Sequence, residues 1–289
     1  MSERKERLVT PQSAAASGDL GTVVEKPLSL WERLYGRSVL RKIAVLIFLA
    51  VLWEVYARWL DNPLLFPTFS ATVEAFYDGI MTGGLPGRAW YSLRILVTGY
   101  AIGIACAALL TAAAISSRLG ADFLDTLTSM FNPLPAIALL PLALIWFGLG
   151  QGSLVFVLVH SVLWAVALNT HSGFLSVSNT LRMVGRNYGL TGPSYVVRLL
   201  IPAAFPSILT GLKIGWAFAW RTLIAAELVF GVSSGSGGLG WFIYENKNQL
   251  EIPSVFAGLF SVILIGLFVE NVIFRNIELR TIRRWGMQS

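Results

Sequence analysis

Two ionisable residues, Arg221 and Glu227, interrupt an apolar run of the sequence that is long enough for a membrane-spanning helix. A charged group inside a membrane is costly, and such residues usually face the interior of a helix bundle or a water-filled path. A guanidinium in a path is a fitting partner for an oxoanion. The alternative is a salt bridge to another helix, because residues six apart on one helix do not stack as an i, i+4 pair does. Arg221 and Glu227 are therefore candidate path-lining residues.

Residue types that catalyse reactions or bind metals are sparse. The chain has one cysteine, Cys106, and two histidines, which are too few soft ligands for a conventional zinc or iron–sulfur site. His160 precedes Ser161, but adjacent residues lie about 100° apart on a helix, and no G-x-S-x-G pattern surrounds a serine. We therefore reject an intramembrane serine protease and any other enzyme, and expect His160 to be a hydrogen-bonded core residue.

The glycine-rich stretch GVSSGSGGLG (231–240) resembles a phosphate-binding loop in composition only. It lacks the lysine of G-x-x-x-x-G-K-[ST], and neither Lys213 nor Lys247 follows a glycine. We expect a flexible or tightly packed loop instead. No ATP, cofactor or metal site is predicted in this chain.

The elements that position these residues are strongly apolar. Of 289 residues, 55% are hydrophobic and only 13% are charged, and the mean hydropathy is +0.66, whereas a soluble domain has about 25% charged residues. A soluble globular protein is excluded. Apolar segments of about 20 residues are long enough to cross a membrane. They do so as helices, because lipid offers no partner for backbone N–H and C=O groups. The sequence predicts an all-α polytopic membrane protein with six spans, at 41–60, 93–115, 124–148, 152–170, 206–230 and 254–274.

Lys and Arg residues predict the orientation of the spans. Twelve of them flank the predicted spans on one side, and only Arg88 and Lys247 lie on the other. The positive-inside rule places both termini in the cytoplasm, so topology explains the net charge of +6 without nucleic acid. Residues 1–30 have no apolar signal-peptide segment, and their composition predicts a disordered cytoplasmic tail before a membrane domain at 31–289.

Two local patterns predict contacts between or along helices. Gly99 and Gly103, like Gly211 and Gly215, repeat a small-x-x-x-small spacing that permits close helix packing. Separately, the charges of one i, i+4 pair in the first span, Glu54 and Arg58, are expected to neutralise each other.

The third predicted span contains three prolines, Pro133, Pro135 and Pro141, within FNPLPAIALLPLALIWFGLG (131–150). Proline removes a backbone donor and clashes with the preceding turn, so a kinked or broken span is expected. Broken backbone at membrane depth survives only where protein or a cavity covers it. This favours an interior position near a pathway over a kinked helix that faces lipid.

The cytoplasmic segment at about 171–204 has helical periodicity. Leu181, Val184 and Tyr188 form an apolar stripe, and polar residues cover the other side. Gly189 is expected either to end this helix with a positive φ or to allow a partner backbone to approach closely. A second short helix at 194–200 is expected to end at Ile201-Pro202. The stripe must be buried against lipid headgroups or a partner protein, and the pattern alone does not decide between them.

The run from 181 to 231 resembles the cytoplasmic-loop signature of binding-protein-dependent ABC importer permeases. That signature reads E-A-A, three residues, Gly, nine residues, Ile, one residue, Leu-Pro. Gly189, Leu199 and Ile201-Pro202 fit it, whereas Met183, Val184 and Gly185 stand at the E-A-A position without its glutamate. PLPAIALLPLALIWFGLG, AAELVFG, GGLGWFIY and ELRTIRRWGM look like the nitrate/sulfonate/taurine branch. The resemblance covers roughly residues 40–287.

The resemblance implies a type I ABC importer permease that carries a small anionic solute of the nitrate, sulfonate, taurine or bicarbonate kind. The implied partners are a second copy of the permease, two ATP-binding subunits that hold ATP and Mg, and an extracytoplasmic substrate-binding protein, at a bacterial inner membrane. The segment at 171–204 would contact the ATPase. The residues implied in this coupling are Leu181, Val184, Gly185, Tyr188, Gly189 and Pro202.

An ion-coupled secondary transporter without an ATPase is the alternative. Six spans would suit it, but the first three and the last three show no similarity of the kind that inverted repeats produce. It would also leave the amphipathic cytoplasmic segment without a role.

Overall fold

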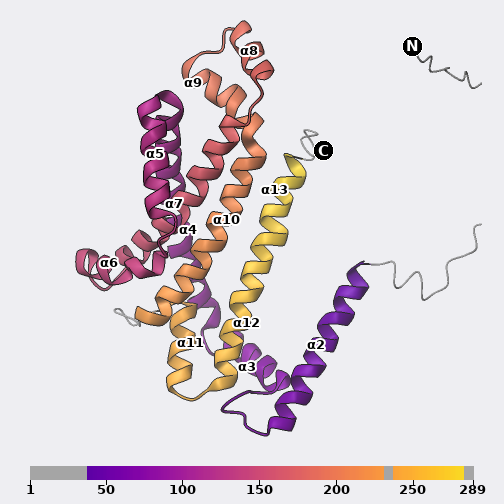
Figure 1. The fold of residues 1–289 in the computed structure, drawn as a ribbon. Coiled ribbons are helices and arrows are strands. Elements are labelled where there is room, and N and C mark those ends of the chain that lie inside the picture. Colours follow the sequence, from indigo (N-terminus) through magenta and orange to yellow (C-terminus); the bar gives the residue numbers. More distant parts are fainter. Residues whose placement is uncertain (1–37, 231–236, 283–289) are drawn as a thin grey trace, which may run out of the picture. The chain divides into compact units, whose positions relative to one another are not determined.

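The computed structural model describes residues 38–230 and 237–282, and every regular element in these two stretches is a helix, as predicted (Figure 1). The tail predicted to be disordered, 1–30, lies outside the described residues. In chain order the elements are α2 (Ser38–Leu60), α3 (Phe69–Met81), α4 (Leu85–Ser116), α5 (Arg118–Phe131), η1 (Ala136–Leu139), α6 (Leu140–Phe147), α7 (Gln151–Leu175), α8 (Asn179–Asn187), α9 (Gly192–Tyr195), η2 (Val196–Leu200), α10 (Ile201–Phe230), α11 (Leu239–Asn248), α12 (Ile252–Phe268), η3 (Val269–Phe274) and α13 (Arg275–Arg280).

The chain divides into a short unit, residues 1–50, and a larger unit, residues 51–289. The described part of the short unit is the first half of α2, whose apolar side chains are almost all exposed. An exposed helix that is apolar all round is suited to lipid rather than to water.

Five helical stretches within the described residues are long and apolar enough to cross a membrane. They are Val39–Leu60, Leu85–Ser116, Gln151–Leu175, Gly192–Val229 and Ile252–Arg280. Each contains most or all of a predicted span and extends it at one or both ends. The remaining predicted span, 124–148, corresponds to a bent pair of helices, so the number of spans is six if that pair is one span.

The third predicted span is broken where its sequence indicates. Arg118–Phe131 and Ala136–Phe147 are bent by 87° relative to each other. Pro133 and Pro135 lie in the gap, where neither can donate to a helical hydrogen bond. Pro141 does not contribute to the break, because this residue lies in the first turn of α6, where a missing N–H costs nothing.

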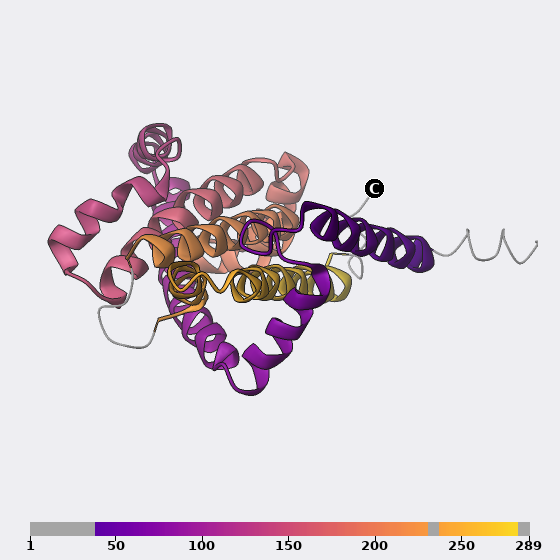
Figure 2. The ribbon, with the colours of Figure 1, turned by 90° about the horizontal axis from the view of Figure 1, so that it is seen from below.

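The core of the larger unit is built around α7, which packs extensively against both α4 and α10. Figure 2 shows α7, α10 and α12 running side by side. A Cβ atom added at Gly99 or Gly103 of α4 would lie only 2.6 or 2.7 Å from a side chain of α7. A Cβ atom at Gly211 or Gly215 of α10 would lie 2.8 or 3.2 Å from a side chain of α7. The two glycine pairs are therefore confirmed as close-packing positions.

Two short helices, α3 and α11, are not predicted from the sequence. Both are too short to cross a membrane, and their apolar residues do not stand out from those of the neighbouring spans. Helix α11 nevertheless buries Leu239, Phe242 and Ile243, and it packs against α10, α12 and α4.

The predicted pair of Glu54 and Arg58 forms, with the Nη2 of Arg58 2.7 Å from the Oε1 of Glu54. The same carboxylate accepts the backbone N–H and the hydroxyl of Ser70, each at 3.0 Å. Glu54 therefore also joins α2 to the first turn of α3.

Candidate functional site

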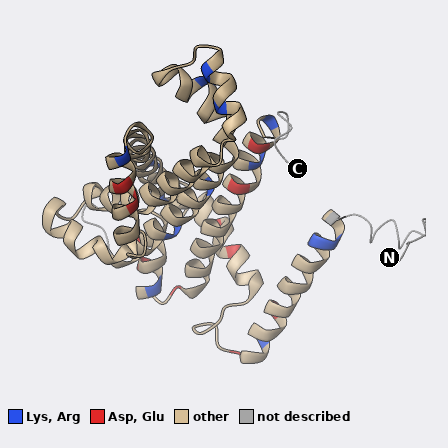
Figure 3. Ribbon diagram, turned by 45° about the horizontal axis from the view of Figure 1, so that its top comes forward, with Lys and Arg blue, Asp and Glu red and all other residues tan. Residues whose placement is uncertain are grey.

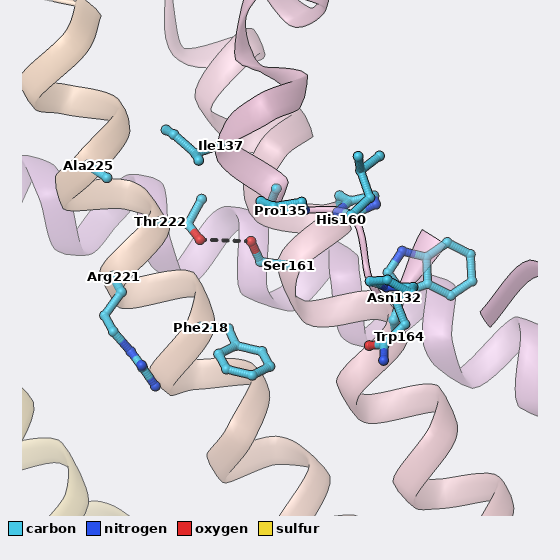
Figure 4. A pocket seen from close by; sticks show the side chains of 13 residues that line it. Asn132, Pro135, Ile137, His160, Ser161, Trp164, Phe218, Arg221, Thr222 and Ala225 are labelled. Atoms are coloured by element: carbon cyan, nitrogen blue, oxygen red, sulfur yellow. Dashed lines mark hydrogen bonds between the residues drawn. The ribbon is translucent and has the colours of Figure 1, made fainter. Parts of the chain in front are cut away.

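A pocket of 390 Å³ opens beside the break between α5 and η1 (Figure 4). Its walls come from three parts of the chain that are distant in sequence: the break, α7 and α10. The lining residues are Asn132, Pro133, Leu134, Pro135, Ala136, Ile137, His160, Ser161, Trp164, Phe218, Arg221, Thr222 and Ala225. The broken backbone thus borders a cavity, as expected for a break at membrane depth.

Arg221 lies on the α10 wall of this pocket and has few interactions. Its Nε donates to the carbonyl of Ala217 at 3.0 Å, and its guanidinium carbon lies 5.5 Å from the ring centre of Phe218. No carboxylate within the two described stretches forms an ion pair with it. A cation beside a cavity and without an acidic partner attracts anions.

His160 and Trp164 lie one helical turn apart on the α7 wall. The rings of Phe131 and Trp164 stack at 5.6 Å, and His160 contacts both of them edge-on. Both ring nitrogens of His160 and the indole nitrogen of Trp164 are buried, and none has a hydrogen-bond partner among the described residues. The expectation of a hydrogen-bonded core histidine is therefore wrong. Such groups are rare because a buried unpaired donor costs free energy.

One hydrogen bond joins the two helices across the pocket. The hydroxyls of Ser161 on α7 and Thr222 on α10 are 3.1 Å apart. Figure 4 shows this bond between Arg221 and Phe218 on one side and His160, Trp164 and Asn132 on the other. The spacing of His160 and Trp164 (i, i+4) is a signal for a shared face. That the face lines a cavity follows only from the packing.

Glu227, the second candidate path residue, lies away from the pocket. It is 4% exposed, and its carboxylate accepts the Ser92 hydroxyl at 2.8 and 2.9 Å and the Gly240 N–H at 2.8 Å. The Ser92 oxygen in turn accepts the N–H of Leu239 at 2.9 Å. This network joins α10, α4 and α11, so the structure does not bring Glu227 and Arg221 together.

The end of the glycine-rich stretch packs directly onto Glu227. A Cβ atom at Gly240 would lie 2.6 Å from both the Cβ of Glu227 and the carbonyl oxygen of Ile224, and one at Gly238 would collide with Ser92 and Glu227. Residues 237–240 are therefore a tightly packed segment, one of the two expected possibilities. Residues 231–236 lie outside the described part of the chain.

The amphipathic helix predicted within residues 171–204 is α8. The Ser178 hydroxyl accepts the N–H of Leu181 at its start. At its end Gly189 has φ +73°, its N–H bonds Arg186 O at 2.9 Å, and the N–H of Leu190 bonds Gly185 O at 3.0 Å. This is a Schellman C-cap, and it confirms the predicted positive φ of Gly189.

The apolar stripe of α8 is exposed in the part of the chain that the structure describes. Leu181 and Val184 are 40% and 43% exposed, and Tyr188 is 82% exposed. Gly185 faces the other way: it is buried, and a Cβ atom there would collide with Leu199 of η2. Figure 3 shows Lys and Arg residues on α8 and on the helical segment that follows it.

Pro202 does not end a helix, contrary to the prediction. The π-helical turn η2 leads directly into α10, and the N–H of Ile201 bonds the carbonyl of Val196. The wider π-helical turn ends just before Pro202 and makes room for the ring, so the helix runs on without a break. The loop and the spanning helix are therefore continuous.

Comparison with known proteins identifies the chain. The sequence profile of the binding-protein-dependent transport system inner membrane component family matches residues 99–283. A putative ABC transporter permease protein of Methanocaldococcus jannaschii is 30% identical over 81% of this chain and 88% of its own length. The nitrate import permease protein NrtB of Synechocystis sp. is 29% identical over 86% of this chain and 90% of its own length. The taurine transport system permease protein TauC of Escherichia coli is 28% identical over 83% of this chain and 88% of its own length.

The family match covers the pocket, α8, most of the second predicted span and all the later ones. Proteins of this family are transport subunits of the inner membrane and not enzymes, and they work with an ATPase and a substrate-binding protein. The chain belongs to the binding-protein-dependent transport system inner membrane component family and is a permease subunit of an ABC importer.

Proposed function

We propose that this permease conducts a small anionic solute of the nitrate, sulfonate, taurine or bicarbonate kind, delivered by an extracytoplasmic binding protein. The observation that carries the proposal is Arg221, a cation at a pocket with no acidic partner in the described chain. A guanidinium binds oxoanions through its planar set of N–H donors. Two relatives are named for nitrate and taurine transport, and both of these solutes carry an anionic group.

Two copies of the chain form the passage in this proposal. Arg221 and Phe218 lie at the exposed side of the single chain, where an unpaired cation would otherwise face lipid at a high cost. A second copy would enclose both pockets in one passage. Both termini lie in the cytoplasm, as the distribution of Lys and Arg indicates.

Two ATP-binding subunits hold ATP and Mg, since this chain has no phosphate-binding motif. Helix α8 docks on them through Leu181, Val184 and Tyr188, whose exposed stripe is too small to hold a helix in water. Gly189 fixes the end of α8. Gly185 packs α8 against Leu199 of η2, and η2 continues into α10 at Pro202. Movement of the ATPase would thus reach the wall that carries Arg221.

The direct test of this function is uptake by the reconstituted complex. Proteoliposomes containing the permease, its ATPase and its binding protein are loaded with ATP, and the uptake of nitrate, methanesulfonate, taurine and bicarbonate is measured. ATP-dependent uptake of one of these anions is expected. Uptake driven by an ion gradient without the ATPase would instead support a secondary transporter.

Docking of α8 is tested by cysteine cross-linking. Cys106, the only cysteine, is replaced by alanine, and Val184→Cys is paired with cysteines in the ATPase groove. Met183→Cys is the matched control, because Met183 is also exposed on α8 but lies off the stripe. A cross-link from position 184 and not from 183 is expected. Equal cross-linking from both positions would contradict the docking face.

Gly189→Val tests whether the end of α8 matters for coupling. No atom lies within 4 Å of a Cβ at Gly189, so the cost of the variant comes from its positive φ and is about 1–3 kcal/mol. We expect normal membrane insertion, with weaker ATPase binding or lost stimulation of ATP hydrolysis by the binding protein. Full assembly and full stimulation would contradict the coupling role. The control, Gly189→Asn, tolerates this backbone conformation and should retain coupling.

A further inference from the structure

A second cavity, of 790 Å³, lies where the ends of α4 and α7 meet α8 and α9. Its polar lining is basic: it includes His171 of α7 and Arg182 and Arg186 of α8, and no Asp or Glu. The nearest acidic residue in sequence, Asp122, follows the lining residue Ala121 but is itself exposed and does not line the cavity. The cavity therefore concentrates positive charge without local compensation.

Arg182 is held in place by the end of α7. Its Nη2 donates to the carbonyl of Phe174 at 2.6 Å, and its Nε donates to the carbonyl of Val177 at 3.1 Å. These bonds satisfy carbonyls at a helix C-terminus, where a cation is stabilised. They fix the guanidinium at the cavity wall and leave other N–H groups available.

Arg186 lies one turn further along the same face of α8. No side-chain hydrogen bond or ion pair of Arg186 occurs within residues 38–230 and 237–282. Like charges at i, i+4 destabilise a helix, and an anion bound between them would relieve this repulsion.

A buried hydroxyl in the same cavity also lacks a partner. The Oη of Tyr195, on α9, is covered from solvent and forms no hydrogen bond within the described chain. A phenol without a partner in a folded protein is unusual. Tyr195 lines the cavity from a different helix than the two arginines.

We propose that this cavity binds the phosphate group of an anionic phospholipid, such as cardiolipin or phosphatidylglycerol. Arginine side chains bind phosphate oxygens through paired N–H donors. The other walls are largely apolar, with Phe174, Leu175 and Leu200 among them, and these suit an acyl chain rather than a hydrated ion. Basic pockets between spanning helices on the cytoplasmic side bind such headgroups. The proposed orientation of the chain determines only which leaflet of the membrane supplies the lipid.

The lipid site connects the membrane to the segment that precedes α10. Arg182 and Arg186 belong to α8, and Tyr195 lies directly before η2. A bound headgroup would therefore hold α8 and α9 against the ends of α4 and α7. Lipid binding is expected to stabilise the complex, because a ligand that binds only the folded state raises its stability.

The experiment uses the purified complex of the permease with its ATPase in mild detergent. Cardiolipin is titrated in, and bound lipid and the Tm are measured by native mass spectrometry and by thermal unfolding. The variant is the double substitution His171→Gln and Arg186→Gln, which leaves the backbone bonds of Arg182 intact. Arg198→Gln is the matched control, because Arg198 is an exposed cation of the same loop that does not line the cavity.

Cardiolipin should raise the Tm of the wild-type complex and of Arg198→Gln alike. The double variant should bind it about tenfold more weakly, because it loses the charge of Arg186 and the imidazole donor of His171. An equal response to phosphatidylcholine, or equal binding by the double variant, would overturn the proposal. Displacement of cardiolipin by millimolar inorganic phosphate would assign the site to a free anion. Loss of the ATPase from the double variant with lipid binding unchanged would assign the basic residues to the ATPase contact.

Discussion

Glu227 and Arg221 lie on the same helix, six residues apart, in opposite surroundings. Glu227 is buried, and the Ser92 hydroxyl and the Gly240 N–H occupy its carboxylate oxygens. Arg221 is exposed at a cavity, and its one hydrogen bond among the described residues goes to a carbonyl of its own helix. Within the described residues, Glu227 thus has hydrogen-bond partners on two other helices, whereas Arg221 has none beyond its own helix.

This difference separates two uses of polarity inside a membrane protein. Polar groups that are paired within the chain hold helices together, as the links from Glu227 to α4 and α11 do. Polar groups left unpaired beside a cavity lower the stability of the fold, so we expect them to have a role in function. Arg221, His160 and Trp164 belong to the second class.

The largest expected effect on stability is that of Glu227→Leu. The substitution leaves the Gly240 N–H and the Ser92 hydroxyl without their acceptor, so the free energy of unfolding should fall by about 3 kcal/mol. Glu227→Gln, which keeps one acceptor oxygen, should cost less. Unfolding in mixed micelles followed by circular dichroism measures both. If Glu227→Leu were as stable as the wild type, the claim that the hydrogen bonds of Glu227 hold helices together would be wrong.

Gly240→Val should have the next largest effect, about 2 kcal/mol, because new side-chain atoms would overpack the contact with Glu227 and Ile224. Gly87→Val is the control, since no atom lies within 4 Å of a Cβ at Gly87 and the cost there reflects helix propensity only. The Tm of each variant gives the difference. Equal Tm values would show that residues 237–240 are less tightly packed than described.

Trp164→Phe should have a smaller effect on stability, below about 1 kcal/mol, because the indole N–H that it removes has no partner to lose. The phenyl ring can still stack on Phe131. If the N–H belongs to the passage, transport should fall while the Tm changes little. A large loss of stability would instead show a structural hydrogen bond.

Several parts of this structure could be predicted from local sequence. Pro133 and Pro135 indicated the break because proline acts on its own turn, and Gly189 indicated a positive φ because its position after α8 requires one. Pro141 and Pro202 show the limit of that reasoning. Pro141 lies in the first turn of its helix, where its N–H is not needed, and Pro202 follows a π-helical turn that makes room for its ring.

The network of Glu227 could not be predicted, because Ser92 lies 135 residues away in sequence. Its polar partners come from α4 and α11, and α11 shows no clear pattern of its own. For the same reason, the sequence could not predict that His160 has no hydrogen-bond partner among the described residues. A sequence shows which donors exist but not which acceptors the packing brings to them.

The most direct test of the account is Arg221→Met in the reconstituted complex, with Arg221→Lys as the charge-preserving control. Met keeps much of the side-chain volume, and Arg221 has no ion pair to lose among the described residues. The Tm should change by less than the equivalent of about 0.5 kcal/mol. Initial uptake of the transported anion should fall at least about tenfold with Met, and Lys should restore part of it. Wild-type uptake by a fully assembled Arg221→Met complex would contradict the assignment of this pocket to the passage.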